Sequence, residues 1–588
     1  MAFDGLFLYA ILQELVPWTG SRVDRIYQPQ KDMLILHLRQ GRETRRLLLA
    51  AGAEQARVHW AEGQYPNPSQ PPLFCMVLRK HLEGARLVAF RQPRLERILE
   101  LEFAVFDELG RPGERLLIAE IMGKHSNIIL LDAGNNTIID GIRRYTHAVS
   151  RHREVLPGQP YIPPPAQAKA DPRTLSEEDF TALLLEGGLD APLDRLLVEK
   201  LAGVGPQSAR EIIFRAGLDE RASIESLGQY DYLRLWQALK ELMEEIEAGK
   251  NKPVVVFDRE GKVRAFAAFR LTQYHGLPSQ ELDTASQACE LFFKEKEAYQ
   301  HFQEKRRSLT NLLQRELKRC QKKAALQAEA VAEGKEAEKW RLAGELITAN
   351  IYRLEKGMQK FTAENFYDPS LSEVEIELDP ALTPAQNAQN YFRRYNRAHK
   401  TAVQAARQLE QTREEINYLE GVIEAVQMAQ DIADLNEISQ ELVEAGYLKP
   451  ETPDKRVKKE RERRSLPLQF TSEDGFTIFV GKNNRQNEWL SLKFSQDHDL
   501  WLHAKDVPGS HVLVRTGGRE VPARTLEQAA SLAAYYSKAR GARKVAVDYT
   551  LCKYLRKPPG SRPGMVTYTD YRTVYVEPCP PGESKAYD

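Results

Sequence analysis

The sequence lacks the features that mark several large classes of protein. Its 588 residues contain no run of about 18 apolar residues that could span a bilayer. The first basic residue is Arg22, so the start lacks the basic region of a secretory signal. We therefore expect a cytoplasmic protein without a membrane partner.

The sequence also has few cysteines and no net charge. The five cysteines are scattered, form no C-x-x-C pair and have an odd count, which favours reduced thiols over a disulfide scaffold or a thiolate zinc site. The 83 basic and 83 acidic residues cancel, which argues against a protein that coats polyanions indiscriminately. Any recognition of nucleic acid must come from local clusters.

The usual catalytic signatures are missing too. The chain has no phosphate-cradling G-x-x-x-x-G-K-[ST] loop, no H-E-x-x-H helix and no arrangement of a nucleophile with its base. The cluster that most resembles a metal site is Asp497, His498, Asp499 and His503, but strand alternation turns neighbouring side chains to opposite faces. We expect no catalytic residue, no metal and no cofactor.

The chain has enough apolar residues to form the cores of several domains. Apolar residues make up 42% and charged residues 28%, as in soluble globular proteins, and the length exceeds what one core organises. We predict an α+β multidomain protein. Its parts are a β-rich domain at 1–172, a helical region with a β-hairpin at 173–285, a coiled-coil middle domain at 286–445, a basic linker at 446–465 and a small α+β domain at 466–588.

The first domain shows short, strongly β-forming segments. They lie at 33–38, 47–50, 98–103, 116–121 and 128–131, and two helices are expected at 6–15 and 73–82. This pattern predicts an antiparallel sheet. A proline-rich linker at 157–172 should close the domain.

One polar loop in this domain stands between two apolar runs. Gly123 permits the bend, and we expect the loop to gather binding side chains at one rim. These are Glu120, Lys124, His125, Ser126 and Asn127. An ordinary surface hairpin is the alternative, because exposed polar residues are the default at turns.

Residues 201–210 show a helix-hairpin-helix signature. Gly203 and Gly205 form a tight turn and Pro206 can open a helix. Free backbone N–H groups at the start of that helix would suit a phosphate. A plain helix connector is the alternative. A short β-hairpin at 254–257 and 263–266 follows.

Two long charged helices are expected at about 286–356 and 384–442. In the second, Leu409, Ile416, Leu419, Ile423 and Val426 follow heptad spacing, which predicts an antiparallel coiled-coil hairpin. Such an arm would be roughly 100 Å long. A small strand should cap it within 361–380, and the aromatic and basic group at 391–395 hints at a partner. A spacer or a dimer zipper is the alternative.

The segment 454–464 holds seven basic residues among eleven and is expected to be a flexible linker that adds phosphate affinity. The last domain should contain strands at 476–480, 500–503, 511–514, 545–547 and 573–576. Thr525 and Gln528 predict a capping box for a helix that runs to about Ala539.

Amide, cationic and aromatic side chains of this last domain predict contacts with RNA backbone and splayed bases. They are Lys482, Asn483, Asn484, Arg485, Trp501, His503, Lys505, Ser510 and His511, with a second patch at Lys553–Lys557 and Arg562. For Trp501 itself, a role in the core is the stronger interpretation.

Several of these motifs resemble those of the NFACT family over essentially the whole chain. The resemblance rests on Phe3–Gly5, Phe74–Leu82, Glu120–Leu131, Gly203–Pro206, Gly344–Asn350, and Asp499–His503 with Pro508–His511. It implies an N-terminal domain similar to the formamidopyrimidine glycosylase N-domain, then a helix-hairpin-helix region, a coiled coil and an RNA-binding NFACT-R domain. The proline nucleophile of the glycosylase is missing here.

The resemblance also implies a function in ribosome rescue. The protein would bind large ribosomal subunits obstructed by peptidyl-tRNA, through rRNA and the stalk-base region, and would hold alanyl-tRNA for template-free alanine tailing of the nascent chain. The ribosome would form the peptide bonds, and the protein would act as a monomer there. A surface adhesin for fibronectin, after an older family label, and a nucleic-acid glycosylase or lyase are the alternatives.

A family Asp-Arg pair associated with tRNA handling matches Glu96 and Arg97 here, with a carboxylate one methylene longer. Asp4, Glu120, Ile121 and Met122 match without change. Acidic groups would accept hydrogen bonds from base edges or 2′-OH groups, while Arg97 and Lys124 hold the backbone. Arg79, His125 and Asn127 complete the expected tRNA site, and Gly203 and Gly205 would face phosphate.

Overall fold

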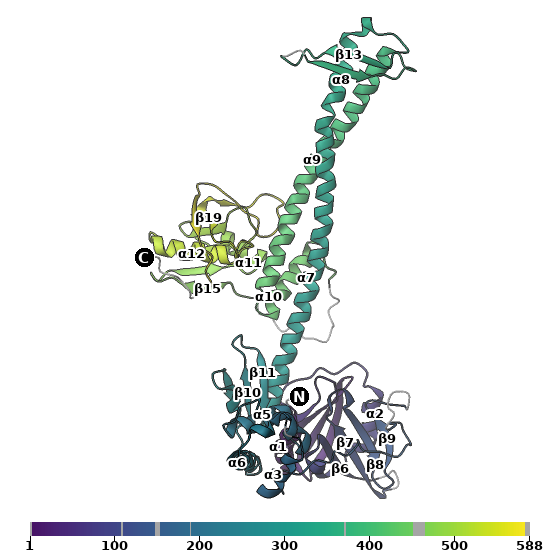
Figure 1. Ribbon diagram of the computed structural model, residues 1–588, viewed down its shortest axis with the longest axis vertical. Helices are drawn as coiled ribbons and strands as arrows, with labels where there is room; N and C mark the ends of the chain where they lie inside the picture. The colour runs from purple at the N-terminus through teal and green to yellow at the C-terminus, as the bar shows by residue number, and fades with distance from the viewer. Residues whose placement is uncertain are drawn as a thin grey trace. The chain divides into compact units, whose positions relative to one another are not determined.

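The computed structural model describes residues 3–106, 110–146, 153–188, 190–369, 372–450 and 465–581. The chain divides into two compact units, residues 1–299 and 300–588, whose elements are labelled in Figure 1. The finer domain borders expected from the sequence stay predictions. The basic run at 454–464 lies outside the described residues.

Nine antiparallel strands form one sheet in the first unit, in the order β4-β3-β2-β1-β5-β6-β7-β8-β9. They are β1 (Arg22–Gln30), β2 (Met33–Gln40), β3 (Glu43–Ala50), β4 (Arg57–Trp60), β5 (Arg86–Arg91), β6 (Ile98–Phe106), β7 (Pro112–Glu120), β8 (Asn127–Asp132) and β9 (Thr137–Gly141). All five predicted strand segments are confirmed. The sheet adds β1, β4, β5 and β9, in which apolar residues are fewer.

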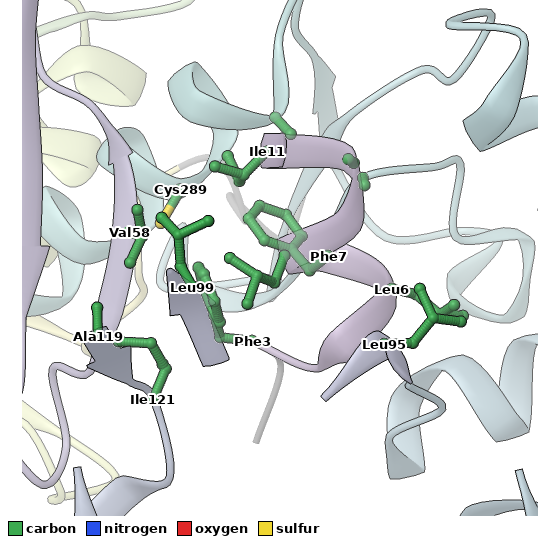
Figure 2. Packing of buried hydrophobic residues seen from close by; sticks show 14 of the residues in the cluster. Phe3, Leu6, Phe7, Ile11, Val58, Leu95, Leu99, Ala119, Ile121 and Cys289 are labelled. Atoms are coloured by element: carbon green, nitrogen blue, oxygen red, sulfur yellow. The ribbon is translucent and has the colours of Figure 1, made fainter. Parts of the chain in front are cut away.

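The sheet wraps around helix α1 (Gly5–Leu15). Strands β1 and β5 pair only at Arg22 and Arg86, so the sheet has two halves, and both contribute side chains to the core around α1. Figure 2 shows Phe3 and Phe7 packed among Val58, Leu99 and Ala119. Helices α1 and α2 (Leu73–Leu82) both confirm the sequence prediction.

A helical module shares this core. Its helices are α3 (Glu177–Leu185), α4 (Leu193–Lys200), α5 (Pro206–Arg215) and α6 (Gln229–Glu247), followed by strands β10 (Val254–Phe257), β11 (Val263–Ala267) and β12 (Ser279–Glu281). The predicted β-hairpin is confirmed as β10 and β11, and β12 adds a third strand. The proline-rich segment that leads into the module is tied to both sides, through Gln159 to β9 and Ala170 to Leu201.

Long helices pack against each other in antiparallel fashion in the second unit, and the first of them begins at Ala285, within the first unit. The elements are α7 (Ala285–Glu336), α8 (Glu338–Ala349), α9 (Pro384–Met428) and α10 (Ile432–Glu444), with the hairpin β13 (Lys360–Glu364) and β14 (Glu373–Glu377) between α8 and α9. Leu313 of α7 and Leu419 of α9 belong to one buried cluster. Farther along, Gly334 lets the helices approach closely, since a Cβ there would lie 2.1 Å from the Cβ of Ala402.

The C-terminal domain is a six-stranded sheet in the order β15-β16-β18-β17-β19-β22. Its elements are β15 (Leu468–Thr471), β16 (Thr477–Val480), α11 (Asn484–Trp489) with a π-helical turn at Leu490–Phe494, β17 (Leu500–Ala504), β18 (Val512–Arg515), α12 (Ala523–Tyr535), β19 (Val545–Leu551), β22 (Arg572–Val576), and the small pair β20 (Leu555–Arg556) and β21 (Thr567–Tyr568). This mixed topology confirms the predicted α+β class.

The predicted capping box is wrong. Pro522 is the N-cap of α12, so the helix starts before Thr525. The Thr525 hydroxyl lies 3.0 Å from the Ser472 hydroxyl and 2.6 Å from the Asp474 carboxylate instead. The helix also ends at Tyr535, four residues before Ala539. Thr525 therefore ties α12 to the turn between β15 and β16.

Gly5→Ala should destabilise the first unit. A Cβ at Gly5 would lie 1.9 Å from the Leu95 carbonyl oxygen and 2.5 Å from the Gly203 Cα, and backbone atoms cannot rotate away. We expect a loss of about 2 kcal/mol or more in unfolding free energy, measured as an earlier transition in calorimetry of the full chain. Gly541→Ala is the matched control, because nothing lies within 4 Å of its Cβ position. Equal stability of the two variants would contradict this close packing.

Candidate functional site

A cavity of about 530 Å³ lies where the sheet domain meets the helical module. It draws its lining from the start of α1, the turn before β6, the proline-rich segment and the loop before α5. Six residues singled out in the sequence line it: Asp4, Glu96, Arg97, Met122, Gly203 and Gly205. The fold thus gathers residues about 200 positions apart in the chain around one opening.

Asp4 joins the starts of two helices beside this cavity. It is the N-cap of α1, where its Oδ1 accepts from the Phe7 N–H at 2.9 Å. Its Oδ2 accepts from the Gly205 N–H at 3.0 Å and from the Ser208 hydroxyl at 2.5 Å, both at the start of α5. Burial raises the pKa of Asp4, and the hydrogen bonds from Ser208, Phe7 and Gly205 lower it in part.

The expected free amide at Gly205 is therefore not available to a phosphate. A carboxylate of the same chain already occupies the positive end of α5, which is where an anion would be bound. Asp4 itself is buried, so the expectation that it accepts hydrogen bonds from base edges is not supported by its position. Gly203 lies with its Cα against Gly5 and serves close packing.

Glu96 and Arg97 follow a turn with unusual backbone geometry. Arg94 and Leu95 both have positive φ, 46° and 55°, which side chains with a Cβ rarely adopt. The Gln92 amide secures the turn by donating to the carbonyl oxygens of Gly5 and Glu96, both at 2.8 Å. Such a conformation persists only where the surroundings impose it. Glu96 and Arg97 are thus held half-buried at the cavity.

Cationic side chains line the cavity beside the Glu96 carboxylate. Burial lowers the pKa of Arg97, and the nearby Asp4 raises it in part. Burial and then the charge of Arg97 lower the pKa of Lys169, whose ammonium donates to the Val198 carbonyl at 2.7 Å. Sequence reasoning did not select Lys169, because nothing in the proline-rich segment marks it. Three cations (Arg94, Arg97 and Lys169) and the Glu96 carboxylate at one opening suit a ligand with both phosphate and hydrogen-bonding edges.

The polar loop after β7 is largely turned inward, contrary to expectation. Glu120 is fully buried, pairs with the Arg153 guanidinium and accepts from the Tyr161 hydroxyl at 2.9 Å. Ile121, Ser126 and Asn127 are buried as well. A buried carboxylate needs a paired cation, and Arg153 supplies it, so Glu120 can lie inside the domain.

Four predicted residues of the first unit have clear positions. Lys124 and His125 are exposed on the short turn Gly123–His125. Arg79 donates to the Ile26 carbonyl at 2.9 Å and lies 3.6 Å from Glu83, so it holds α2 on the sheet. Asn127 donates to the Arg143 carbonyl at 3.0 Å. Of the predicted rim, only Lys124 and His125 face solvent.

The predicted RNA-binding run Lys482–Arg485 contacts α10 instead. The Lys482 ammonium lies 3.1 Å from the Asp434 carboxylate, the Asn483 amide donates to Glu437 at 2.8 Å and the Asn484 amide to Glu441 at 2.9 Å. Arg485 pairs with Glu444. These residues attach the C-terminal domain to α10, because its face presents acidic side chains. In the second predicted patch, Arg562 lies over the Tyr418 ring of α9, whereas Lys553, Arg556 and Lys557 are exposed.

Trp501, His503 and His511 form an aromatic cluster inside the C-terminal domain. The Trp501 indole donates to the Ser491 hydroxyl at 3.0 Å, and that hydroxyl lies 2.7 Å from the His511 Nδ1. Burial lowers the pKa of His503 to about 4, and burial with the neighbouring His503 holds the pKa of His511 well below 6.5. Trp501 is buried, as the core interpretation predicted.

Two further predicted residues lie beside this cluster. Ser510 is buried, and its N–H donates to the Tyr536 carbonyl at 2.9 Å. The Lys505 ammonium lies 3.8 Å from the Asp548 carboxylate and 5.4 Å from the Tyr571 ring. Lys505 is half-buried and lies beside the exposed ring of Tyr571.

Within the described ranges, no group of three or more His, Cys, Asp or Glu side chains is arranged to hold a metal ion. Asp499 shows why its neighbourhood differs from a metal centre. Its carboxylate accepts from the Gln496 N–H at 2.9 Å and from the Thr516 N–H at 3.1 Å.

Across the same described ranges, no helix is both long enough and apolar enough to cross a membrane.

The fold and the cavity define a multidomain α+β protein with a cavity lined by charged groups in its first unit and a long helical hairpin before its last domain. The chain belongs to the NFACT family. Residues 4–462 match the NFACT N-terminal and middle domains, and residues 467–569 match the NFACT protein RNA binding domain.

Three known proteins show the range of similarity. The chain is 37% identical to the Rqc2 homolog RqcH of Bacillus subtilis, over 98% of each chain. It is 24% identical to the ribosome quality control complex subunit NEMF of Mus musculus, over 61% of this chain and 34% of that protein. The crystal structure of the fibrinogen binding protein from Staphylococcus aureus matches 50% of this chain and 99% of that chain, at 29% identity and a TM-score of 0.42.

The stability of the C-terminal domain should fall as the pH drops from about 6.5 toward 4. The folded domain keeps His503 and His511 neutral, whereas the unfolded chain binds a proton at each, so the unfolding free energy decreases with falling pH. The slope should approach about 1.4 kcal/mol per pH unit for each histidine. Urea unfolding at several pH values measures it. His503→Gln should roughly halve the slope, and an unchanged slope would contradict this assignment.

Proposed function

We propose that this protein is a ribosome quality control factor that binds large ribosomal subunits obstructed by peptidyl-tRNA. The observation that carries the proposal is its membership in the NFACT family over nearly the whole chain, with relatives named for ribosome quality control. Its zero net charge agrees with a selective RNA ligand, because a protein that coats polyanions indiscriminately would carry an excess of basic residues.

The cavity at Glu96 and Arg97 is the proposed contact for tRNA. Arg97 can hold a phosphate, and Glu96 can accept a hydrogen bond from a base edge or a 2′-OH. Lys169 and Arg94 add two further cations at the same opening. In this proposal the tRNA is alanyl-tRNA, the ribosome forms the peptide bonds, and alanine tailing marks the nascent chain in the cytoplasm. The similarity of the sheet domain to the glycosylase N-domain also stays a prediction.

Sequencing the RNA that co-purifies with the full-length protein from its own cells tests the proposal. We expect large-subunit rRNA and a tRNA enriched for alanine acceptors. Recovery of neither would end the proposal. Recovery of rRNA with a mixture of all tRNAs would remove the alanyl-tRNA assignment and keep the ribosomal one.

Glu96→Ala with Arg97→Ala should abolish tRNA recovery and leave large-subunit recovery unchanged. The double variant removes both the cation and the acceptor at the cavity, while contacts made by the second unit remain. The matched control is Arg42→Ala with Glu43→Ala, an exposed Arg/Glu pair at the turn between β2 and β3. Loss of both RNAs, or of neither, would count against the assignment of tRNA to this cavity.

A further inference from the structure

The C-terminal sheet has one face that is fully covered. Helix α12 packs on it, against alternate side chains of every long strand. The side chains that face α12 include Ile478, Val480, Leu502, Val514, Val547 and Val576. Packing against α12 occupies these side chains, which favours the opposite face for a contact with a ligand.

The opposite face is covered over only part of its width. Trp501 of β17 and Leu513 of β18 are buried there against Leu490 and Leu555. Toward β19 and β22 the cover ends. Tyr571 is 48% exposed and Tyr575 is 63% exposed. Because β22 is the last strand of the sheet, this end of the face is open both above and at the side. We call it the open sheet end, formed by Lys505, Lys544, Tyr571, Thr573 and Tyr575.

A buried carboxylate links neighbouring segments at the open sheet end. Asp548 of β19 is 2% exposed and accepts from the Thr573 hydroxyl at 2.6 Å and from the Tyr568 hydroxyl at 2.9 Å. The Tyr568 ring in turn meets the Tyr571 ring edge-on, at 5.2 Å between centroids. Tyr571 thus extends an aromatic series that begins at the buried Trp501, 5.0 Å from Tyr568.

Each of the two exposed rings has a cation beside it. The Lys505 ammonium lies 5.4 Å from the centroid of Tyr571, and the Lys544 ammonium lies 5.7 Å from the centroid of Tyr575. An aromatic face next to an ammonium can stack a base while the ammonium meets the adjoining phosphate. The pairing occurs twice, on residues four positions apart, so two nucleotides could be held in the same way.

We propose that the open sheet end binds an unpaired segment of RNA, with bases stacked on Tyr571 and Tyr575 and phosphates at Lys505 and Lys544. The inference rests on the proposed function for the choice of RNA as ligand. The exposed carboxylates of Asp506 and Asp570 lie next in sequence to Lys505 and Tyr571. They disfavour a duplex, whose phosphates are densely spaced, more than a single strand held mainly through its bases.

Fluorescence anisotropy with the full-length protein tests this inference. The probe is a labelled oligouridylate of about 12 nucleotides, a length within the usual range for one sheet-based site. A duplex RNA of the same length is the second probe. The test variant is Tyr571→Ala with Tyr575→Ala, and Tyr571→Phe with Tyr575→Phe keeps the rings. Tyr230→Ala with Tyr352→Ala is the matched control, because these tyrosines are 71% and 81% exposed elsewhere.

We expect the double alanine variant to bind the oligouridylate at least about fivefold more weakly for each ring lost. The phenylalanine variant and the control should bind as the unaltered protein does. Lys544→Ala should lower the slope of log affinity against log salt by about 0.7, as expected for one lost phosphate contact. The unaltered protein should prefer the single strand to the duplex.

Unchanged affinity of the double alanine variant, or equal loss in the control, would overturn the inference. Binding of a strand-forming peptide at the edge of β22 with no effect of the tyrosines on RNA would assign the open sheet end to a protein partner and also overturn it. Failure of the proposed function is distinguishable, because it would show as absence of ribosomal RNA and tRNA from the purified protein whatever the tyrosine variants do.

Discussion

The carboxylate of Asp4 is the interaction on which the first unit depends. It caps α1 and, through Gly205 and Ser208, it also caps α5, which begins 202 positions later in the chain. The free N–H groups at each helix start need a hydrogen-bond acceptor, and the Asp4 carboxylate serves both helices. The shared acceptor brings Gly5 against Leu95 and Gly203 at distances that admit no side chain. The turn that presents Glu96 and Arg97 is therefore fixed by the same contact.

Buried charge is used throughout for assembly. Glu120 with Arg153, Lys482 with Asp434, and Asp548 with its two hydroxyl donors each satisfy a carboxylate that has left water. A buried ion costs several kcal/mol unless it is paired, so each of these carboxylates lies where a partner from a distant segment can reach it. The polar motifs that stand out in the sequence are mostly of this kind. Fewer charged groups than the motifs suggest remain for a ligand.

The strands and helices with strong local patterns follow from the sequence. Helix α2 begins and ends where its apolar spacing predicts, and the heptad positions around Leu419 pack against α7 as expected. Elements with weaker patterns, such as β1 and β5, need their neighbours, because only pairing within the sheet buries their few apolar residues. The start of α12 shows the limit of local signals, since Pro522 and the tertiary contacts of Thr525 override a plausible capping box.

For the candidate site too, the sequence and the tertiary structure determined different features. The family resemblance pointed to Asp4, Glu96 and Arg97, and the helix-hairpin-helix signature pointed separately to Gly203 and Gly205. The sequence also determined the order of a β-rich domain, a helical module, paired long helices and a small α+β domain. Tertiary structure decided which of these groups are exposed and which are buried. Burial and pairing are properties of contacts between distant segments, so Glu120 and Lys482 became internal contacts, whereas Tyr571 and Tyr575 were left exposed at the end of a sheet.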